Sequence, residues 1–278
     1  MTITYGTTLP QREFKNEVES IKEFVLGAES LGLSYLRVAD QVVVPKRGGF
    51  HEPLMLLSYL AAITERIEMV PSVLVAPSRQ TALLAKQIVE LHVLLAGRLR
   101  LGLGLGGNAK EYQAMGKSLS RRGYRLEEQI KLFRQLWSRD RVSFSLAEER
   151  FEGVGISPRP NGEAIPIWIG VSPEPPVQAL ERIGRSADGW FTMCRVDQFE
   201  SQHKVVLESV KRSGRSISDI GVEAEVSIAN LVPENFISLV KRWQDLGVSH
   251  ISLSTLGLEG DSSSHLKVLA KALELLGK

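Results

Sequence analysis

Four glycines and an asparagine follow one apolar segment in the middle of the chain. The alternating stretch 99–105 contains two of the glycines, and Gly106, Gly107 and Asn108 come directly after it. Because glycine has no Cβ, a flat or phosphorylated group can lie directly against the backbone of such a segment. No clean G-x-G-x-x-G opens a helix directly, and a lone match to this dinucleotide-binding fingerprint is a weak signal in any case. The segment therefore predicts either a cofactor-binding surface or a glycine-rich strand in a crowded sheet.

A glycine and a hydroxyl also follow a second apolar segment, residues 165–169. The Gly-Val-Ser sequence of residues 170–172 precedes a predicted helix, and the amides at a helix N-terminus favour anions. Thr192 and Arg195 stand at the end of a further apolar segment, where an arginine adds a charge-assisted contact. Because neighbouring strand ends lie close together, these residues predict a phosphate-binding site.

Other interpretations of the polar residues stay open. Arg195 alternatively pairs with Asp197, and Thr192 then only caps a turn. Asp40 ends the predicted strand 35–39, where an acid orients a substrate or accepts backbone N–H bonds in a turn. His51, in the loop that follows, is an acid–base group or a surface histidine. Asp40 and His51 are therefore the candidate catalytic residues.

The composition is that of an ordinary globular protein and argues against several classes of function. Of the 278 residues, 43% are apolar and 24% are charged, which allows a full core. The formal net charge of +2 argues against a nucleic-acid surface. The basic cluster Lys117, Arg121, Arg122 and Arg125 adjoins two glutamates, so we expect a solvated helix face. The histidines are scattered without metal-ligand spacing, and no metal site is expected.

Cysteine usage and the apolar runs bear on the compartment. Cys194 is the one cysteine of the sequence, so an intrachain disulfide is impossible and a reducing compartment is expected. The chain shows no basic segment followed by an apolar core at its start, so no signal peptide is expected. The longest apolar run, near residues 54–63, is too short to cross a bilayer. We therefore expect a cytoplasmic protein.

Apolar strands and amphipathic helices alternate along the whole chain. Such alternation implies a parallel sheet, because a crossover helix must return the chain. Eight strand–helix units predict an α/β fold, a (β/α)8 barrel of eight parallel strands in one domain (residues 1–278), with a doubly wound sheet as the alternative. A short hairpin-like insertion, residues 142–151, separates the fourth and fifth units. The expected strands are 3–8, 35–39, 67–75, 99–105, 165–169, 189–192, 220–226 and 250–253, and the expected helices are 14–31, 53–65, 81–95, 121–136, 175–183, 198–212, 233–246 and 265–276.

A barrel gathers the carboxyl ends of its strands on one rim, and ligand chemistry lies at that rim. The glycine-bearing ends of the fourth and fifth strands would meet there, together with residues 72–77 of the third strand. A shared ligand site is then favoured over a strand that is merely rich in glycine.

Several ordered blocks of the sequence also resemble a known family. Their order and spacing, over nearly the whole chain, resemble the luciferase-like monooxygenase family, barrel oxidoreductases that use a flavin or the deazaflavin coenzyme F-420. The last strand and helix look most like the short deazaflavin-type members. The blocks are LGLSYLRVADQ, LAAITERIEMVPSVLVAP, LLAKQIVELHVLLAGRLRLGLGLGGNAKEYQAMG, RFEGVGISPRPNGEAIPIWIGVSPEPP and ADGWF.

The resemblance implies a cofactor ring that lies across the strand ends. Ser72 and Val73 resemble the bulge where family members hold a non-prolyl cis peptide behind the ring. The backbone of Gly104 and Gly106 would pack against the same ring, and Asn108 looks like a cofactor-contacting position. These five residues are expected to bind the cofactor.

The resemblance also implies where the cofactor phosphate lies. Gly170, Val171 and Ser172 match the phosphate loop of the family, although its second position is usually glycine. Thr192 and Arg195 match the Thr-x-x-Lys phosphate pattern of deazaflavin enzymes, with arginine in place of lysine. This pattern favours coenzyme F-420, with FMN a close second.

Two departures from the family bear on the reaction. Gln41 stands where many members use a catalytic histidine, and Gly107 stands where deazaflavin-dependent sugar-phosphate dehydrogenases need a glutamate. We therefore do not expect sugar-phosphate oxidation. The expected activity is hydride transfer to or from a small organic substrate, or monooxygenation if the cofactor is FMN. The family implies a homodimer, and the loop 42–51 would cover the substrate. The alternatives are a flavin-binding family member without turnover and a phosphate-binding barrel lyase or isomerase.

Overall fold

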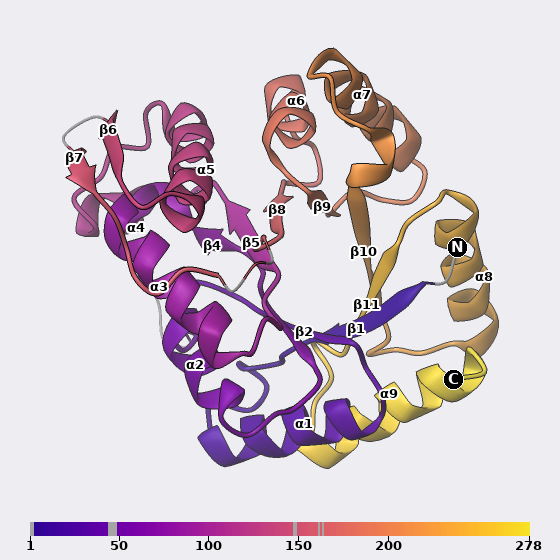
Figure 1. The fold of residues 1–278 in the computed structure, drawn as a ribbon. Helices are drawn as coiled ribbons and strands as arrows, with labels where there is room; N and C mark the ends of the chain where they lie inside the picture. The colour runs from indigo at the N-terminus through magenta and orange to yellow at the C-terminus, as the bar shows by residue number, and fades with distance from the viewer. Residues whose placement is uncertain (1–2, 44–48, 147–148, 161, 163) are drawn as a thin grey trace.

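A closed parallel sheet surrounded by helices forms the computed structural model of the chain (Figure 1). The structure describes residues 3–43, 49–146, 149–160, 162 and 164–278. In the order in which they pair, the strands are β3 (Glu68–Pro71), β2 (Tyr35–Val38), β1 (Thr4–Thr8), β11 (His250–Ser254), β10 (Gly221–Ser227), β9 (Gly189–Thr192), β8 (Ile167–Gly170), β5 (Leu101–Gly104) and β4 (Leu74–Val75), and each pair is parallel.

The sheet closes because its two edge strands are pieces of one segment. Only Ser72 and Val73 separate β3 from β4 in the chain, so the third strand of the barrel pairs with β2 through its first half and with β5 through its second. An isolated parallel bridge between Met69 and Leu99 adds to the second contact. The predicted (β/α)8 barrel is therefore confirmed, with its third strand broken in two.

Helices cover the outside of the barrel, and the first and last of them pack against each other (Figure 1). Proline occupies the first turn of α2 and of α8, where it needs no backbone hydrogen-bond partner. The helices are α1 (Val18–Ser30), α2 (Pro53–Ala61), α3 (Thr81–Leu94), α4 (Ala109–Ala114), α5 (Arg122–Ser138), α6 (Val177–Ser186), α7 (Phe199–Arg212), α8 (Pro233–Asp245) and α9 (Ser262–Leu275), with single 3-10 turns η1 (Ala76–Ser78) and η2 (Ile217–Asp219).

The bounds of several helices differ from the sequence prediction; α2, for example, ends at Ala61, four residues earlier than expected. α1 begins four residues later than expected, because Lys15 and Asn16 take left-handed backbone angles, with φ of 53° and 59°. α9 begins earlier, because Asp261 accepts the N–H of Ser264 and caps it. α4 was not expected, and the Asn108 side chain caps it in the same way.

The inside of the barrel holds bulky side chains that glycines on neighbouring strands accommodate. A Cβ on Gly6 would lie 2.4 Å from the Tyr35 ring, and one on Gly189 or on Gly221 would lie 2.3 Å from Trp168. The Tyr35 and Trp168 rings belong to a small apolar cluster that is separate from the main core. The main core lies outside, between the sheet and the helices.

The predicted insertion is present as the antiparallel pair β6 (Val142–Leu146) and β7 (Glu149–Val154). Glu149 fastens it to the barrel, because its carboxylate accepts the N–H of Thr81 at 3.1 Å and pairs with Lys117 and Arg125. Burial alone would raise the pKa of Glu149, but these contacts hold its pKa below the usual value. Arg125 is buried, so the expectation of a solvated basic face at this residue is wrong.

Within the described ranges, no helix is long and apolar enough to cross a membrane. The same residues contain no group of three or more histidine, cysteine, aspartate or glutamate side chains placed to hold a metal ion.

Candidate functional site

A cavity of about 710 Å³ opens where β5, β8 and β9 end, which is the rim predicted from the sequence. Its size is that of a small-molecule or cofactor site. The seven predicted cofactor-binding residues that line it are Ser72, Val73, Gly104, Gly106, Gly170, Val171 and Ser172.

Val73 forms the floor of the cavity. The peptide bond between Ser72 and Val73 is cis, which confirms the expectation from the family resemblance. A Cβ on Gly104 would lie 2.3 Å from Cγ2 of Val73, and a Cβ on Gly170 would lie 2.7 Å from its Cγ1. The Val73 side chain therefore fills the space that both glycines leave, and the resulting floor suits a flat ring.

Three arginines, from the start of α5 and from α6, line the opposite end of the cavity. Arg121 stands directly before α5 with φ of 56°, and Arg122 donates from Nη1 to the carbonyl of Leu119. Arg182 pairs with Glu127 at 3.0 Å. In the described part of the chain, neither Arg121 nor Arg122 has a carboxylate partner. The cavity therefore has an apolar floor and a positively charged end.

Burial is the main influence on the pKa of Arg182, and the neighbouring charges modify it. Its burial lowers the pKa, the pairing with Glu127 opposes that change, and the nearby Arg185 and Arg122 lower it further. Arg121 is exposed, as the expectation of a solvated face requires, whereas Arg122 is only partly exposed and lines the cavity. The sequence could not show this, because it depends on where α5 meets the rim.

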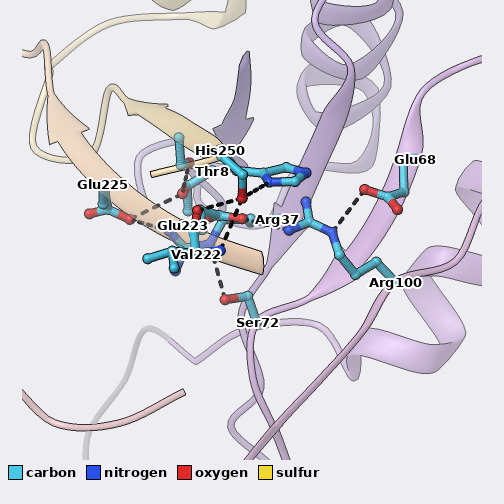
Figure 2. A network of polar contacts seen from close by, with 11 residues as sticks. Thr8, Arg37, Glu68, Ser72, Arg100, Val222, Glu223, Glu225 and His250 are labelled. Carbon is cyan, nitrogen blue, oxygen red and sulfur yellow. Dashed lines mark hydrogen bonds and ion pairs between the residues drawn. The ribbon is translucent and has the colours of Figure 1, made fainter. Parts of the chain in front are cut away.

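The inner end of the cavity is closed by Arg37, which projects from β2 into the barrel. Figure 2 shows its guanidinium among Glu225, Glu223 and Ser72. Nη1 lies 2.8 Å from Glu225 Oε2 and 3.4 Å from Glu223 Oε1, and Nε donates to Ser72 Oγ at 3.0 Å. Thr8 donates its hydroxyl to the same Glu225 oxygen at 3.3 Å. Arg37 thereby links β2, the cavity floor and β10.

A second arginine continues this network deeper in the barrel (Figure 2). Arg100 pairs with Glu223 and with Glu68, each at 2.9 Å, and its guanidinium lies 4.4 Å from the Tyr35 and Trp168 ring centres. Burial, together with the charge of Arg100, lowers the pKa of the adjacent histidine, His250, to about 3. The barrel interior is therefore a layered network of ion pairs and aromatic rings.

The two candidate catalytic residues do not line the cavity. The Asp40 carboxylate accepts the N–H of Val75 and pairs with Arg79, both at 2.9 Å. Burial raises the pKa of Asp40, and the two contacts oppose that change. His51 Nε2 lies 2.9 Å from the carbonyl oxygen of Asn16. Both side chains have structural partners, and their catalytic roles stay predictions.

Three further predicted residues also lie outside the cavity wall. Asn108 accepts from the amide of Lys110 to cap α4, and its Nδ2 donates to the carbonyl of Val43. Thr192 is buried against Cys194, with their Oγ1 and Sγ atoms 2.9 Å apart. The Arg195 side chain is 80% exposed and pairs with Asp197 at 3.0 Å, as in the alternative interpretation. Cofactor contacts of these three residues stay predictions.

Sequence reasoning missed Arg37, Glu225 and Arg182, and the first two had a detectable signal. Arg37 is the one charged residue of the apolar strand β2, and Glu225 alternates with apolar residues in β10, as Glu223 does, at positions that alternation turns toward the barrel interior. Of the loop 42–51 that was expected to cover the substrate, residues 44–48 lie outside the described ranges.

Comparison with known proteins agrees with this site. The luciferase-like monooxygenase profile matches residues 3–230. A relative from Nocardia farcinica, named F420-dependent glucose-6-phosphate dehydrogenase, is 30% identical over 234 residues, which are 80% of this chain and 68% of the relative. This agreement extends over the strands whose ends form the cavity.

Two solved structures share the fold. An F420-dependent secondary alcohol dehydrogenase in complex with an F420-acetone adduct superposes with a TM-score of 0.83 at 14% identity, covering 99% of each chain. The oxygenating constituent of 3,6-diketocamphane monooxygenase from Pseudomonas putida, in complex with FMN, gives 0.74 at 15% identity and covers 100% of this chain and 98% of that one. With the profile match and the cavity at the strand ends, these findings show that the chain is an oxidoreductase that belongs to the luciferase-like monooxygenase family.

Proposed function

We propose that the protein transfers hydride to or from a small organic substrate, with coenzyme F420 as its cofactor and FMN as the second candidate. The single observation that carries this proposal is one cavity with an apolar floor at Val73 and a cluster of arginines at its other end. A flat ring joined to an anionic chain matches that arrangement. The curated relatives named F420-dependent dehydrogenases support the choice of coenzyme F420.

The residues of the chain would position the two ends of the cofactor. Val73, with the bare backbone of Gly104 and Gly170, would support the ring. Arg122 and Arg182 would hold the phosphate-bearing end, because guanidinium groups form charge-assisted bonds with phosphate. The bound cofactor would supply the hydride chemistry, and the protein would supply position and electrostatics.

Arg195 remains the alternative ligand of the phosphate. Its partner Asp197 lies in the same loop, and an incoming phosphate would have to compete with that carboxylate. Ser172 lines the cavity and is compatible with either position of the phosphate.

The substrate is proposed to differ from that of the curated relatives. Their name specifies glucose 6-phosphate. In this chain Gln41 stands where many family members use a catalytic histidine, and Gly107 stands where the sugar-phosphate dehydrogenases need a glutamate. A monooxygenase with FMN is the second candidate function, favoured by the similarity in fold to an FMN-dependent monooxygenase. A lyase or isomerase is disfavoured, because no lysine is among the described residues that line the cavity.

Fluorescence titration of the purified protein with coenzyme F420 and with FMN tests the proposal. We expect binding of coenzyme F420, and a loss of affinity of about 10- to 150-fold in Arg122→Ala, from the 1.5–3 kcal/mol of a charged hydrogen bond. Arg195→Ala is the matched comparison. If Arg195→Ala alone weakens binding, the phosphate lies at the strand β9 end, and if neither cofactor binds, the proposed function is refuted.

A homodimer is proposed for the assembled protein. α2 and α3 contact each other and expose Met55, Tyr59, Leu83 and Leu94, with 71%, 40%, 57% and 59% of their surface accessible. Side chains of this kind gathered on adjacent helices suit a second copy of the chain. Light scattering of the purified protein would distinguish a dimer from a monomer. The lone free cysteine, Cys194, fits the expected cytoplasmic location.

A further inference from the structure

The mouth of the barrel has two chemically different halves. The cavity lies over β5, β8 and β9, where Gly104, Gly170 and the apolar residues Leu105, Phe191 and Met193 line it. The other half, over β1, β2, β10 and β11, is polar on its inner face. Thr8 and Ser252 place their hydroxyl oxygens 3.2 Å apart there, and Arg37 and Glu225 lie beside them. If the first half receives the cofactor, the second half faces the substrate.

Arg37 is fixed at the boundary between these halves. Ser72 holds its Nε and two carboxylates hold its Nη1, while Nη2 has no hydrogen-bond partner among the described residues. Its side chain is only 8% exposed, and the residue lines the cavity. A buried guanidinium with an open Nη2 amino group is a pre-organised donor for a ligand oxygen.

Glu225 places an open acceptor next to that donor. Its Oε2 accepts from Arg37 and Thr8, whereas Oε1 has no partner in the described part of the chain. Its flanking residues, Ala224 and Val226, are buried toward the helices, so the 27% exposure of the Glu225 side chain lies on the inner face. The carboxylate is thus oriented through one oxygen and accessible through the other.

We propose that Arg37 and Glu225 bind and exchange the proton of an uncharged alcohol or its carbonyl product. The inference rests on the proposed function, because the cofactor must take or give the hydride. In the oxidative direction the substrate carbon loses hydride to the cofactor, the substrate O–H bond breaks, and its proton goes to Glu225 Oε1. The new carbonyl oxygen stays hydrogen-bonded to Arg37 Nη2. The reverse step returns the same proton and hydride.

The other titratable side chains near the barrel are less suited to this step. Asp40 is held by Arg79 and by the amide of Val75, and His51 contacts the backbone of Asn16. His250 lies inside the barrel, where burial and Arg100 lower its pKa to about 3, so it stays neutral.

The local charge selects the class of substrate. Arg37 lies within 3.4 Å of two carboxylates, Glu223 and Glu225, so its positive charge is already matched. A phosphate or carboxylate at Arg37 would meet the open Glu225 oxygen and be repelled. An uncharged hydroxyl donates to that oxygen without such a penalty. The pair therefore favours uncharged alcohols and ketones over sugar phosphates and hydroxy acids.

The experiment begins with protein that has been loaded with coenzyme F420, so that failure of the proposed function appears separately as absent cofactor binding. Binding of cyclohexanone is then measured by saturation-transfer NMR, and oxidation of cyclohexanol, lactate and glucose 6-phosphate is measured by cofactor absorbance. We expect cyclohexanone to bind the wild type and not Arg37→Met. Cyclohexanol should be the preferred substrate of the three.

Variants of Glu225 separate proton exchange from a structural role. In Glu225→Gln we expect kcat to fall by about 10²- to 10⁴-fold, the usual contribution of a general base, with KM and cofactor affinity little changed. Added formate should restore part of kcat in Glu225→Ala. Glu68→Gln is the matched control, because it removes an ion pair with Arg100 from the same network at its far end.

Several outcomes would overturn the inference. These are a loaded wild type that does not bind cyclohexanone, a preference for lactate or glucose 6-phosphate, and a Glu225→Gln variant with wild-type kcat. Equal losses of kcat in Glu225→Gln and Glu68→Gln, without rescue by formate, would show that both residues only stabilise the fold.

Discussion

Replacing Gly104 by alanine tests how the floor of the cavity is built. The added Cβ would lie 2.3 Å from Cγ2 of Val73 and 3.3 Å from its Cβ. Carbon atoms in favourable contact lie about 3.5–4.0 Å apart, so Val73 would have to retreat by roughly 1.2 Å. It has little room to do so, because its Cγ1 already fills the space in front of Gly170. A β-branched side chain also has few alternative rotamers.

The expected magnitude follows from two opposing effects. Overpacking a filled site costs about 1–3 kcal/mol. An alanine in place of glycine restricts the unfolded chain and stabilises by about 0.4–1 kcal/mol. With both effects near the middle of their ranges, the net loss for Gly104→Ala should be about 1.3 kcal/mol in the free energy of unfolding.

Urea denaturation of the protein without cofactor is the assay, and Gly107→Ala is the matched control. Gly107 lies three residues further on, in the loop after β5; its φ lies outside the left-handed region, and a Cβ there would meet nothing within 4 Å. We expect Gly107→Ala to be as stable as the wild type or slightly more stable. If Gly104→Ala is equally stable, Val73 is not confined and the account of the cavity floor is wrong. If it is destabilised, its affinity for the cofactor should fall as well.

Three further changes test the surroundings of the site by the same urea titration. Arg100→Met should destabilise the fold by about 3–5 kcal/mol, because Glu223 has no exposed side-chain surface and loses its closer cation; a loss below about 1 kcal/mol would contradict this. Glu29→Gln should cost about 1–3 kcal/mol at neutral pH, because three backbone N–H groups donate to the carboxylate. Burial would raise the pKa of Glu29, but those bonds hold the pKa below its ordinary value of 4.5. The stability difference between Glu29→Gln and the wild type should therefore vanish as the pH falls below 4.5. An equal stability difference at acid and neutral pH would refute the assignment. Asn108→Ala should cost about 1 kcal/mol as a lost helix cap, whereas Asn108→Ser should stay within a few tenths; equal losses would exclude the capping role.

The sequence was sufficient to predict the barrel and the glycine-lined side of its cavity. Strand and helix periodicity determines the alternation, and the glycines at residues 104 and 170 mark the strand ends where backbone must stay bare. These signals are local, so a single sequence carries them. The order of the eight strands then follows from the right-handed crossover of each unit.

The charged half of the site depends on contacts between distant parts of the chain. Arg37 and Glu225 are 188 residues apart, and they meet only because β2 and β10 close one barrel in a particular register. The sequence predicts a solvated helix face for Arg122 for a similar reason. The point where α5 meets the rim depends on tertiary packing, which local patterns do not show. Conversely, the partner of Arg195, Asp197, is only two residues away. The sequence alone therefore offered this ion pair as the alternative to a phosphate-binding role.

The broken third strand has a consequence for how the barrel opens. Between this strand and β5, the ladder consists of the pairs Leu74 with Leu103 and Val75 with Gly104, and one isolated bridge. This seam therefore has few cross-strand bonds, and the cavity floor lies on it. A ligand that contacts both Val73 and Gly104 would hold the third strand and β5 together. Amide hydrogen exchange along β4 and β5 should then slow on ligand binding, because a ligand that binds only the closed seam stabilises the closed seam.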